Sequence, residues 1–191
     1  SWESQVFRSK SKPQKRTPWN KGKLVGQKAP FTMQEIWSIR MRLQTIGNRR
    51  DLALFNLAID SKLRGCYLVR LRVSDVASAG ASLSRATVRP RTTKRPVRFE
   101  LTGRTRNSIE EWIDSAQLTE SDYLFPSRVR RSPHLSTRQY ARIVNDWVRA
   151  IGLDPSAYGT HSLRRTKATL IYRRTKNLRA VQLLLGHTNL D

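Results

Sequence analysis

The sequence predicts an α+β domain that is mainly helical and carries one small antiparallel β-sheet. Apolar residues recur at helical intervals over most of the chain, and several of these runs begin at a capping residue or end at a glycine. Residues 85–101 change to the alternating pattern of a β-hairpin. We find no break in composition after residue 31, so we expect a single domain over residues 31–191.

Residues 1–30 are expected to form a basic, flexible N-terminal arm. They are rich in Lys, Pro and Gly and show neither a helical nor a strand period. The domain is expected to begin at Phe31, because Thr32 and Glu35 have the spacing of a capping box. Gly47 should end this first helix.

Further helices are expected on both sides of the hairpin. Ser136, Thr160 and Asn177 are the expected N-caps of the last three helices, and Gly186 is the expected end of the final one. The short run at residues 123–126 is expected to be a buried connection. The expected helices cover residues 49–63, a short stretch near 68–73, 104–117, 137–151, 161–174 and 178–185.

The charge of the chain points to a polyanionic partner. The 37 Lys and Arg residues outnumber 14 Asp and Glu, which gives a formal net charge of +23. A field of this strength attracts polyanions, of which nucleic acid is the commonest. An anionic membrane fits less well, because basic residues occur in every segment rather than on one amphipathic helix. A surface that is charged only for solubility is the plain alternative.

Composition also excludes several classes of protein. The single cysteine, Cys66, rules out a disulfide scaffold and a cysteine-based zinc site, and three histidines leave little room for a histidine-rich metal centre. No apolar run approaches the roughly 18 to 20 residues of a membrane span. The basic N-terminus lacks the apolar core of a secretory signal. We therefore expect a soluble, cytoplasmic protein without a metal or a membrane partner.

Three separated places combine a cation with a turn or a histidine. Lys62–Gly65 closes an apolar helix, His161–Arg165 opens another, and Leu184–His187 leaves a third at a glycine. Arginine binds phosphate oxygens in a bidentate manner, histidine moves protons near neutral pH, and a helix N-terminus adds N–H donors. Converging arginines and histidines would therefore suit a phosphate group that becomes pentavalent during a reaction.

In this order the three places resemble the sequence boxes of the tyrosine recombinase (phage integrase) family. The first box matches residues 63–64 (Leu-Arg) and 68–75 (Leu-Val-Arg-Leu-Arg-Val-Ser-Asp). The second matches residues 161–169 (His-Ser-Leu-Arg-Arg-Thr-Lys-Ala-Thr), and the third residues 184–190 (Leu-Leu-Gly-His-Thr-Asn-Leu). The resemblance covers about residues 31–191, nearly all of the catalytic domain, and implies its DNA breaking-rejoining fold.

The resemblance implies site-specific DNA recombination. Such enzymes cut one strand with a tyrosine, hold it as a 3′-phosphotyrosyl link and pass it to a new partner. They need no metal or other cofactor, because the covalent link conserves the phosphodiester energy. By position, Arg64 and Arg164 would clamp the scissile phosphate, His161 would transfer protons and His187 would bind a non-bridging oxygen.

The hairpin lysine that protonates the leaving 5′ oxygen in this family is out of register. Strict alignment from Arg95 places Thr92 at the lysine position. Lys94 would be close enough if the turn is rebuilt, and we assign the role to it. The other interpretation is that Lys94 is a turn cation that only touches the DNA backbone.

Two further departures concern an acidic residue and the nucleophile. The family has an acidic residue three positions after its first arginine, where this chain has Tyr67, so Asp60 or Asp75 would have to substitute. The nucleophilic tyrosine belongs about ten residues after the second histidine. The sequence ends at Asp191, so we expect this chain to lack it and to be inactive alone. Tyr172 is expected to lie in the core.

Double-stranded DNA is the expected partner, as for bacterial recombinases and integrases of mobile elements that act at the nucleoid. We expect a free monomer that assembles as a homotetramer on two DNA sites. The cations expected to contact DNA are Lys21, Lys23, Arg91, Arg95 and Arg165.

Two other functions stay open. A non-catalytic DNA-binding protein of the same fold, which regulates by occupying a site, would account for the missing tyrosine and for Tyr67 and Thr92. A basic RNA-binding or nucleoid-packaging protein would account for the charge but leave the ordered boxes as coincidence.

Overall fold

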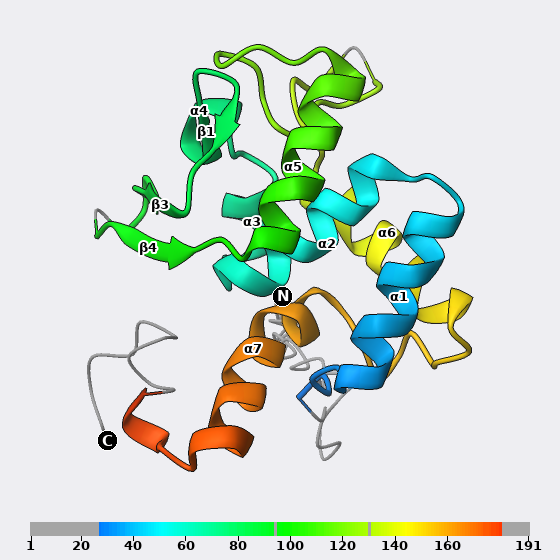
Figure 1. Cartoon of the computed structure of the whole chain (residues 1–191). Coiled ribbons are helices and arrows are strands. Elements are labelled where there is room, and N and C mark those ends of the chain that lie inside the picture. Colours follow the sequence, from blue (N-terminus) through cyan, green and yellow to red (C-terminus); the bar gives the residue numbers. More distant parts are fainter. Residues whose placement is uncertain (1–26, 94, 130, 181–191) are drawn as a thin grey trace, which may run out of the picture.

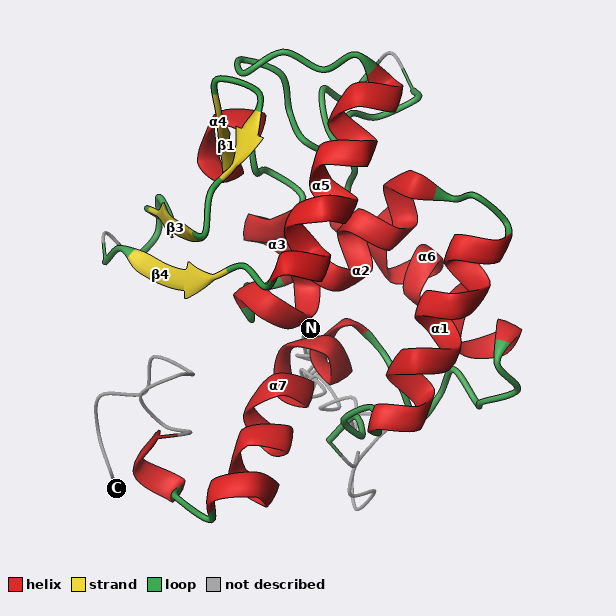
Figure 2. Cartoon of the chain, viewed as in Figure 1, coloured by secondary structure: helices red, strands yellow, loops and turns green. Residues whose placement is uncertain are grey.

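A computed structural model describes residues 27–93, 95–129 and 131–180 of the chain. In chain order the elements are α1 (Met33–Thr45), α2 (Arg49–Ser61), α3 (Gly65–Leu68), α4 (Val73–Val76), β1 (Ala77–Ser78), β2 (Ala81–Ser82), β3 (Arg85–Val88), β4 (Val97–Glu100), α5 (Gly103–Ala116), α6 (Thr137–Ala150) and α7 (Thr160–Thr175). Helices make up most of the fold, and the strands gather on one side, near α3 and α4 (Figure 2). The predicted fold class is confirmed.

Helix α2 lies at the centre of the fold and contacts α1, α5 and α7 (Figure 1). Residues Asp51–Ser61 are all buried, which is typical of a helix that other elements cover on every side. The ring of Trp147 in α6 packs edge-on against Phe55, with 5.4 Å between the ring centroids. This packing fixes the position of α2 and of the residues that follow it.

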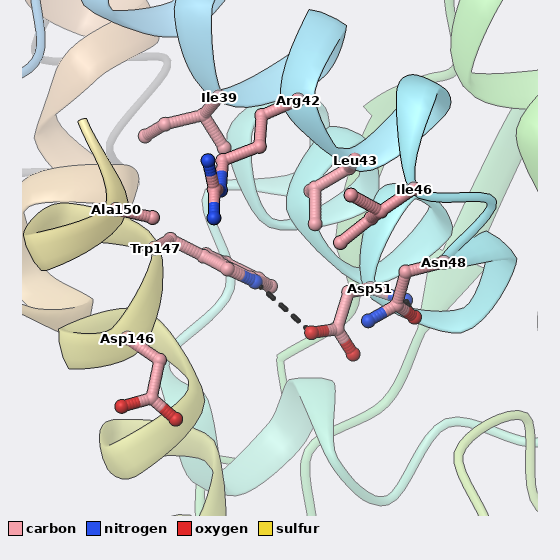
Figure 3. A pocket seen from close by; sticks show the side chains of 9 residues that line it. All are labelled: Ile39, Arg42, Leu43, Ile46, Asn48, Asp51, Asp146, Trp147 and Ala150. Carbon is pink, nitrogen blue, oxygen red and sulfur yellow. Dashed lines mark hydrogen bonds between the residues drawn. The ribbon is translucent and has the colours of Figure 1, made fainter.

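A surface pocket of about 270 Å³ lies between α1 and α6. Figure 3 shows apolar side chains of both helices around it, with the Trp147 indole directed at a carboxylate of α2. The indole Nε1 donates to Oδ2 of Asp51 over 3.0 Å. None of the residues predicted to bind phosphate or DNA lines this pocket.

The predicted helix caps are mostly confirmed. Thr32 and Glu35 form the capping box before α1, and Ser136 forms one with Gln139 before α6. The Oδ1 of Asn177 accepts from the amide of Ala180 over 3.0 Å, as expected of a cap. Gly186, the expected end of that last helix, lies outside the described residues.

The predicted cap of α7 is wrong by one residue. Thr160 is the first residue of the helix, and Gly159 is its N-cap. The Gly159 amide donates to Oγ of Ser162 over 3.0 Å. The Ser162 hydroxyl thus accepts from the amide of the N-cap itself, which is a different bond from the one that a capping threonine accepts from an amide of the first turn.

The predicted hairpin is present, and the structure adds a second, shorter one. Strands β3 and β4 pair antiparallel, with Ala86 opposite Phe99. Strands β1 and β2 also pair, through a turn in which Ala79 and Gly80 both have positive φ. The sequence did not reveal this ribbon, because Ala and Ser carry none of the β-branched or aromatic signal of a strand.

The prediction that Tyr172 belongs to the core is wrong. Its side chain is 40% exposed on α7. The apolar residues beside it identified a helix correctly, but periodicity does not show whether another element covers that face. Within the described residues, none of the helices is long and apolar enough to cross a membrane.

Replacing Ser136 with alanine should lower the free energy of unfolding by about 1 kcal/mol, because the Gln139 amide loses its capping acceptor. Urea unfolding would measure the change. Thr137→Ala is the matched control, since Thr137 is exposed and should change stability by less than about 0.5 kcal/mol. Equal losses in the two variants would contradict a capping role for Ser136.

Candidate functional site

The fold brings together the two arginines that the sequence selected. Arg64 follows the end of α2 and is the N-cap of α3, whereas Arg164 lies in the second turn of α7. The pKa of Arg164 is lowered, first by burial and then by the positive charge of Arg64. Two guanidinium groups therefore share one site, and each raises the affinity of the site for an anion.

The end of α2 holds Arg164 in place. Lys62 closes this helix in the left-handed conformation, at φ 55° and ψ 19°. The carbonyl oxygens at a helix C-terminus lack partners within the helix. The Nε of Arg164 donates to the carbonyl oxygen of Lys62 over 3.0 Å and so satisfies one of them.

Gly65 fixes the place of Arg64. A Cβ atom at Gly65 would lie 3.1 Å and 3.3 Å from two ring carbons of Tyr140. Tyr140 is buried in α6, and burial raises the pKa of its phenol. Because glycine lets α3 pack this closely on α6, the position of the preceding Arg64 is set by a core contact.

Asp60 joins three helices beside the arginines. Its side chain is 3% exposed. One carboxylate oxygen accepts from the amide and the hydroxyl of Thr102, the N-cap of α5, at 2.9 Å each. The other accepts from Nζ of Lys167 in α7 over 3.3 Å. The ends of α2 and α5 and the middle of α7 therefore meet at one buried charge.

Neither of the acidic residues expected to support Arg64 bonds to it. Asp60 is occupied by Thr102 and Lys167, and Oδ2 of Asp75 accepts from the backbone amide of Arg72 over 2.8 Å. Within the described residues, the Arg64 guanidinium has no hydrogen bond or ion pair with a side chain. Its cationic donors are free to bind an external anion.

Two residues that depart from the family pattern contact each other. The Tyr67 hydroxyl is hydrogen-bonded to the Thr92 hydroxyl. The resemblance gives these two positions an acid and a lysine. Here a neutral pair joins α3 to the turn between β3 and β4. Lys94, to which we assigned the lysine's role, lies outside the described residues.

The structure describes some of the remaining predicted site residues but not all of them. His161 is exposed in the first turn of α7, one turn before Arg164. Arg91 and Arg95 are exposed in the hairpin turn. Arg165 donates through Nη1 to the carbonyl oxygen of Lys28 over 2.8 Å. His187, Lys21 and Lys23 lie outside the described residues, so their roles stay predictions.

Sequence reasoning gave no role to Lys62, Lys167 or Thr102. Lys167 lies three residues after Arg164, so helical spacing already placed both on one face of α7. Thr102 precedes the helix that Arg104 was expected to begin, which is typical of an N-cap. Nothing in the sequence pairs these residues with Asp60, because 42 and 107 positions separate Thr102 and Lys167 from it.

The sequence matches the pattern of a known family and is similar to several known proteins. The pattern of the phage integrase family matches residues 31–191. A tyrosine recombinase of Pseudothermotoga lettingae is 30% identical over 162 residues, which are 85% of this chain and 52% of that protein. The probable integrase/recombinase YoeC of Bacillus subtilis is 31% identical over 142 residues, 74% of each chain. The chain spans about half the length of several such relatives.

Solved structures agree on the fold. The crystal structure of XerA recombinase aligns with a TM-score of 0.70 and 22% identity, over 86% of this chain and 58% of that one. The XerH recombinase bound to its difH substrate, in a pre-cleavage complex, aligns with a TM-score of 0.66 and 20% identity over 84% and 48%.

The Tyr67–Thr92 contact predicts coupling between these positions. In the Tyr67→Asp, Thr92→Lys double variant, the new ion pair should recover about 0.5 kcal/mol of unfolding free energy relative to the sum of the single variants. A double-mutant cycle in urea measures this coupling. Tyr67→Asp with Thr93→Lys is the control pair and should show none. Equal coupling in both cycles would mean that Tyr67 and Thr92 do not meet in solution.

Proposed function

The chain belongs to the phage integrase family, and from this premise we propose that it acts on double-stranded DNA as the catalytic domain of a site-specific tyrosine recombinase. The observation that carries the proposal is the pairing of Arg64 with Arg164 through the end of α2. Two guanidinium groups beside each other suit a phosphodiester, whose charge increases as it becomes pentavalent.

The proposed roles follow from this pair. Arg64 and Arg164 bind the non-bridging oxygens of the scissile phosphate. His161, exposed on the same helix as Arg164, takes part in proton transfer. His187 binds a non-bridging oxygen, and Lys94 supplies the proton for the leaving 5′ oxygen. The opening of α7 contributes its backbone N–H groups to the same negative charge.

The covalent step needs a tyrosine. Its phenolate oxygen forms a bond to phosphorus while the bond from phosphorus to the 5′ oxygen breaks, and that oxygen takes a proton. The family's position for this residue, about ten residues after His187, lies beyond Asp191. Tyr172 does not fit the role, because it lies two turns after Arg164 on the same helix. We therefore assign the nucleophile to none of these residues; a tyrosine that reaches the site from a neighbouring protomer would still need a donor segment that carries it.

The basic arm and the charge suit a DNA partner. Residues 1–30 serve as an arm that tracks the phosphate backbone, with Lys21 and Lys23 among its cations, and residues 31–191 form the domain. Arg91, Arg95 and Arg165 add contacts from the hairpin turn and from α7. Free protein is monomeric, and four copies assemble on two DNA sites at the bacterial nucleoid.

One observation favours a second function. Tyr67 and Thr92, which contact each other, stand at positions where the family keeps an acid and a lysine. A protein with this change could bind its site without cutting it. The second candidate is therefore a DNA-binding regulator of the same fold that occupies recombination sites.

Covalent trapping separates the two candidates. Protein that includes the family's tyrosine position should form a denaturation-resistant adduct on nicked duplex carrying its target site, seen as a shifted band on a denaturing gel. Arg164→Ala should reduce the rate of adduct formation by about 10²-fold to 10³-fold, because a transition-state contact to phosphate is lost.

Arg173→Ala is the matched control for that variant. Arg173 is exposed on the same helix, so its loss removes one positive charge without touching the arginine pair. Its adduct should form at close to the wild-type rate. Site-specific binding without any adduct would reject the recombinase and leave the regulator.

A further inference from the structure

The backbone of Lys62 is in an unusual conformation for its residue type. At φ 55° it lies in the left-handed region, where glycine or asparagine normally ends a helix. A residue with a Cβ atom is strained there, and such strain tends to persist where a side chain has a function. The strained backbone of Lys62 therefore points to a function of its side chain.

Lys62 is largely covered, and its ammonium has no counter-ion among the described residues. The residue is only 9% exposed. Within the described residues, no acceptor bonds to its ammonium group, and both oxygens of nearby Asp60 are taken by Thr102 and Lys167. Burial lowers the pKa of Lys62 first, and the charge of Lys167 lowers it further, against the weaker pull of Asp60 and Glu100. The side chain is largely covered, and within the described residues its ammonium has no acceptor, so the arrival of an anion is favourable there.

Lys62 lies next to the arginine pair, both along the chain and in space. Its carbonyl oxygen holds Arg164, and it lies two residues before Arg64. Its neighbour Lys167 follows Arg164 by three residues, on the same face of α7. Lys62 and Arg64 thus lie near the cations of α7, and the nearest buried carboxylate, Asp60, forms an ion pair only with Lys167.

We propose that Lys62 is a phosphate ligand and that it forms a second anion subsite beside Arg64 and Arg164. The subsite takes an oxygen of the DNA phosphodiester backbone. This choice of ligand rests on the proposed function, whereas the anion subsite itself rests on the unpaired ammonium of a largely covered lysine beside the arginine pair.

The chain provides a matched control for Lys62. Lys176 ends α7 in almost the same conformation, at φ 55° and ψ 20°, but is exposed. Lys62→Gly and Lys176→Gly each remove one positive charge and one strained backbone position. Neither should lower the midpoint of thermal unfolding, because glycine adopts positive φ without strain. A difference in anion binding between them therefore reports the subsite rather than folding.

DNA binding is the first measurement. Fluorescence anisotropy with a short duplex of arbitrary sequence, over a series of salt concentrations, should show roughly tenfold weaker binding for Lys62→Gly at low salt than for Lys176→Gly. The slope of log affinity against log salt should fall by about 1 for Lys62→Gly. Equal losses in the two variants would overturn the proposal.

Nuclear magnetic resonance of the lysine Cε groups is the second measurement, with inorganic phosphate as the probe. The signal missing from Lys62→Gly should titrate below the ordinary range of a lysine in the wild-type protein, because burial lowers the pKa of Lys62. Added phosphate should shift the Lys62 signal and raise its pKa, because an anion stabilises the charged ammonium. A Lys62 signal that titrates with the surface lysines and ignores phosphate would refute the subsite.

The subsite and the recombinase proposal can fail separately. If Lys62 responds to phosphate and duplex but no covalent adduct forms on a target site, the subsite stands and the recombinase does not. If the adduct forms at the wild-type rate in Lys62→Gly and Lys62 ignores phosphate, the recombinase stands and the subsite is wrong.

Discussion

A carboxylate removed from water must be surrounded by donors or cations, because an unpaired buried charge costs several kcal/mol. At the end of α2 this requirement applies to Asp60, and its partners come from two other helices. Thr102 binds it where α5 begins, and Lys167 binds it from α7. Satisfying one charge therefore fixes the ends of α2 and α5 against α7. The arginine pair depends on this junction, since Arg164 lies one turn before Lys167 and Arg64 follows the end of α2.

The site concentrates positive charge in a chain that already has a large excess of it. Each cation placed there repels the others, and the lowered pKa values of Arg164 and Lys62 express this repulsion together with burial. An arrangement of this kind does not favour the stability of the free protein. It is understandable in a protein that binds a polyanion, because the attraction of each cation to a bound phosphate offsets the repulsion between the cations. The strained backbone of Lys62 also fits a site that binds a polyanion.

Signals that act within a few residues were predictable from the sequence. The capping boxes at Thr32 and Ser136 and the alternation of β3 and β4 identified elements and their ends. The arginine pair came from the spacing of family motifs. What the sequence could not show are contacts between distant segments. Asp60 with Lys167 and Tyr67 with Thr92 meet only in the folded chain, and the exposure of Tyr172 depends on which elements cover α7.

The Asp60→Asn variant tests most directly whether Asp60 holds the three helices together. Two quantities are measured on it: its affinity for duplex DNA and the hydrogen exchange of α5 and α7. The variant is more positive than the wild type, so electrostatics alone would make it bind DNA more tightly. The account predicts the opposite: weaker binding, with protection lost at the start of α5 and in α7. Glu111→Gln is the control, because Glu111 is exposed and its loss should tighten binding slightly. Tighter binding by Asp60→Asn with unchanged exchange would contradict the account.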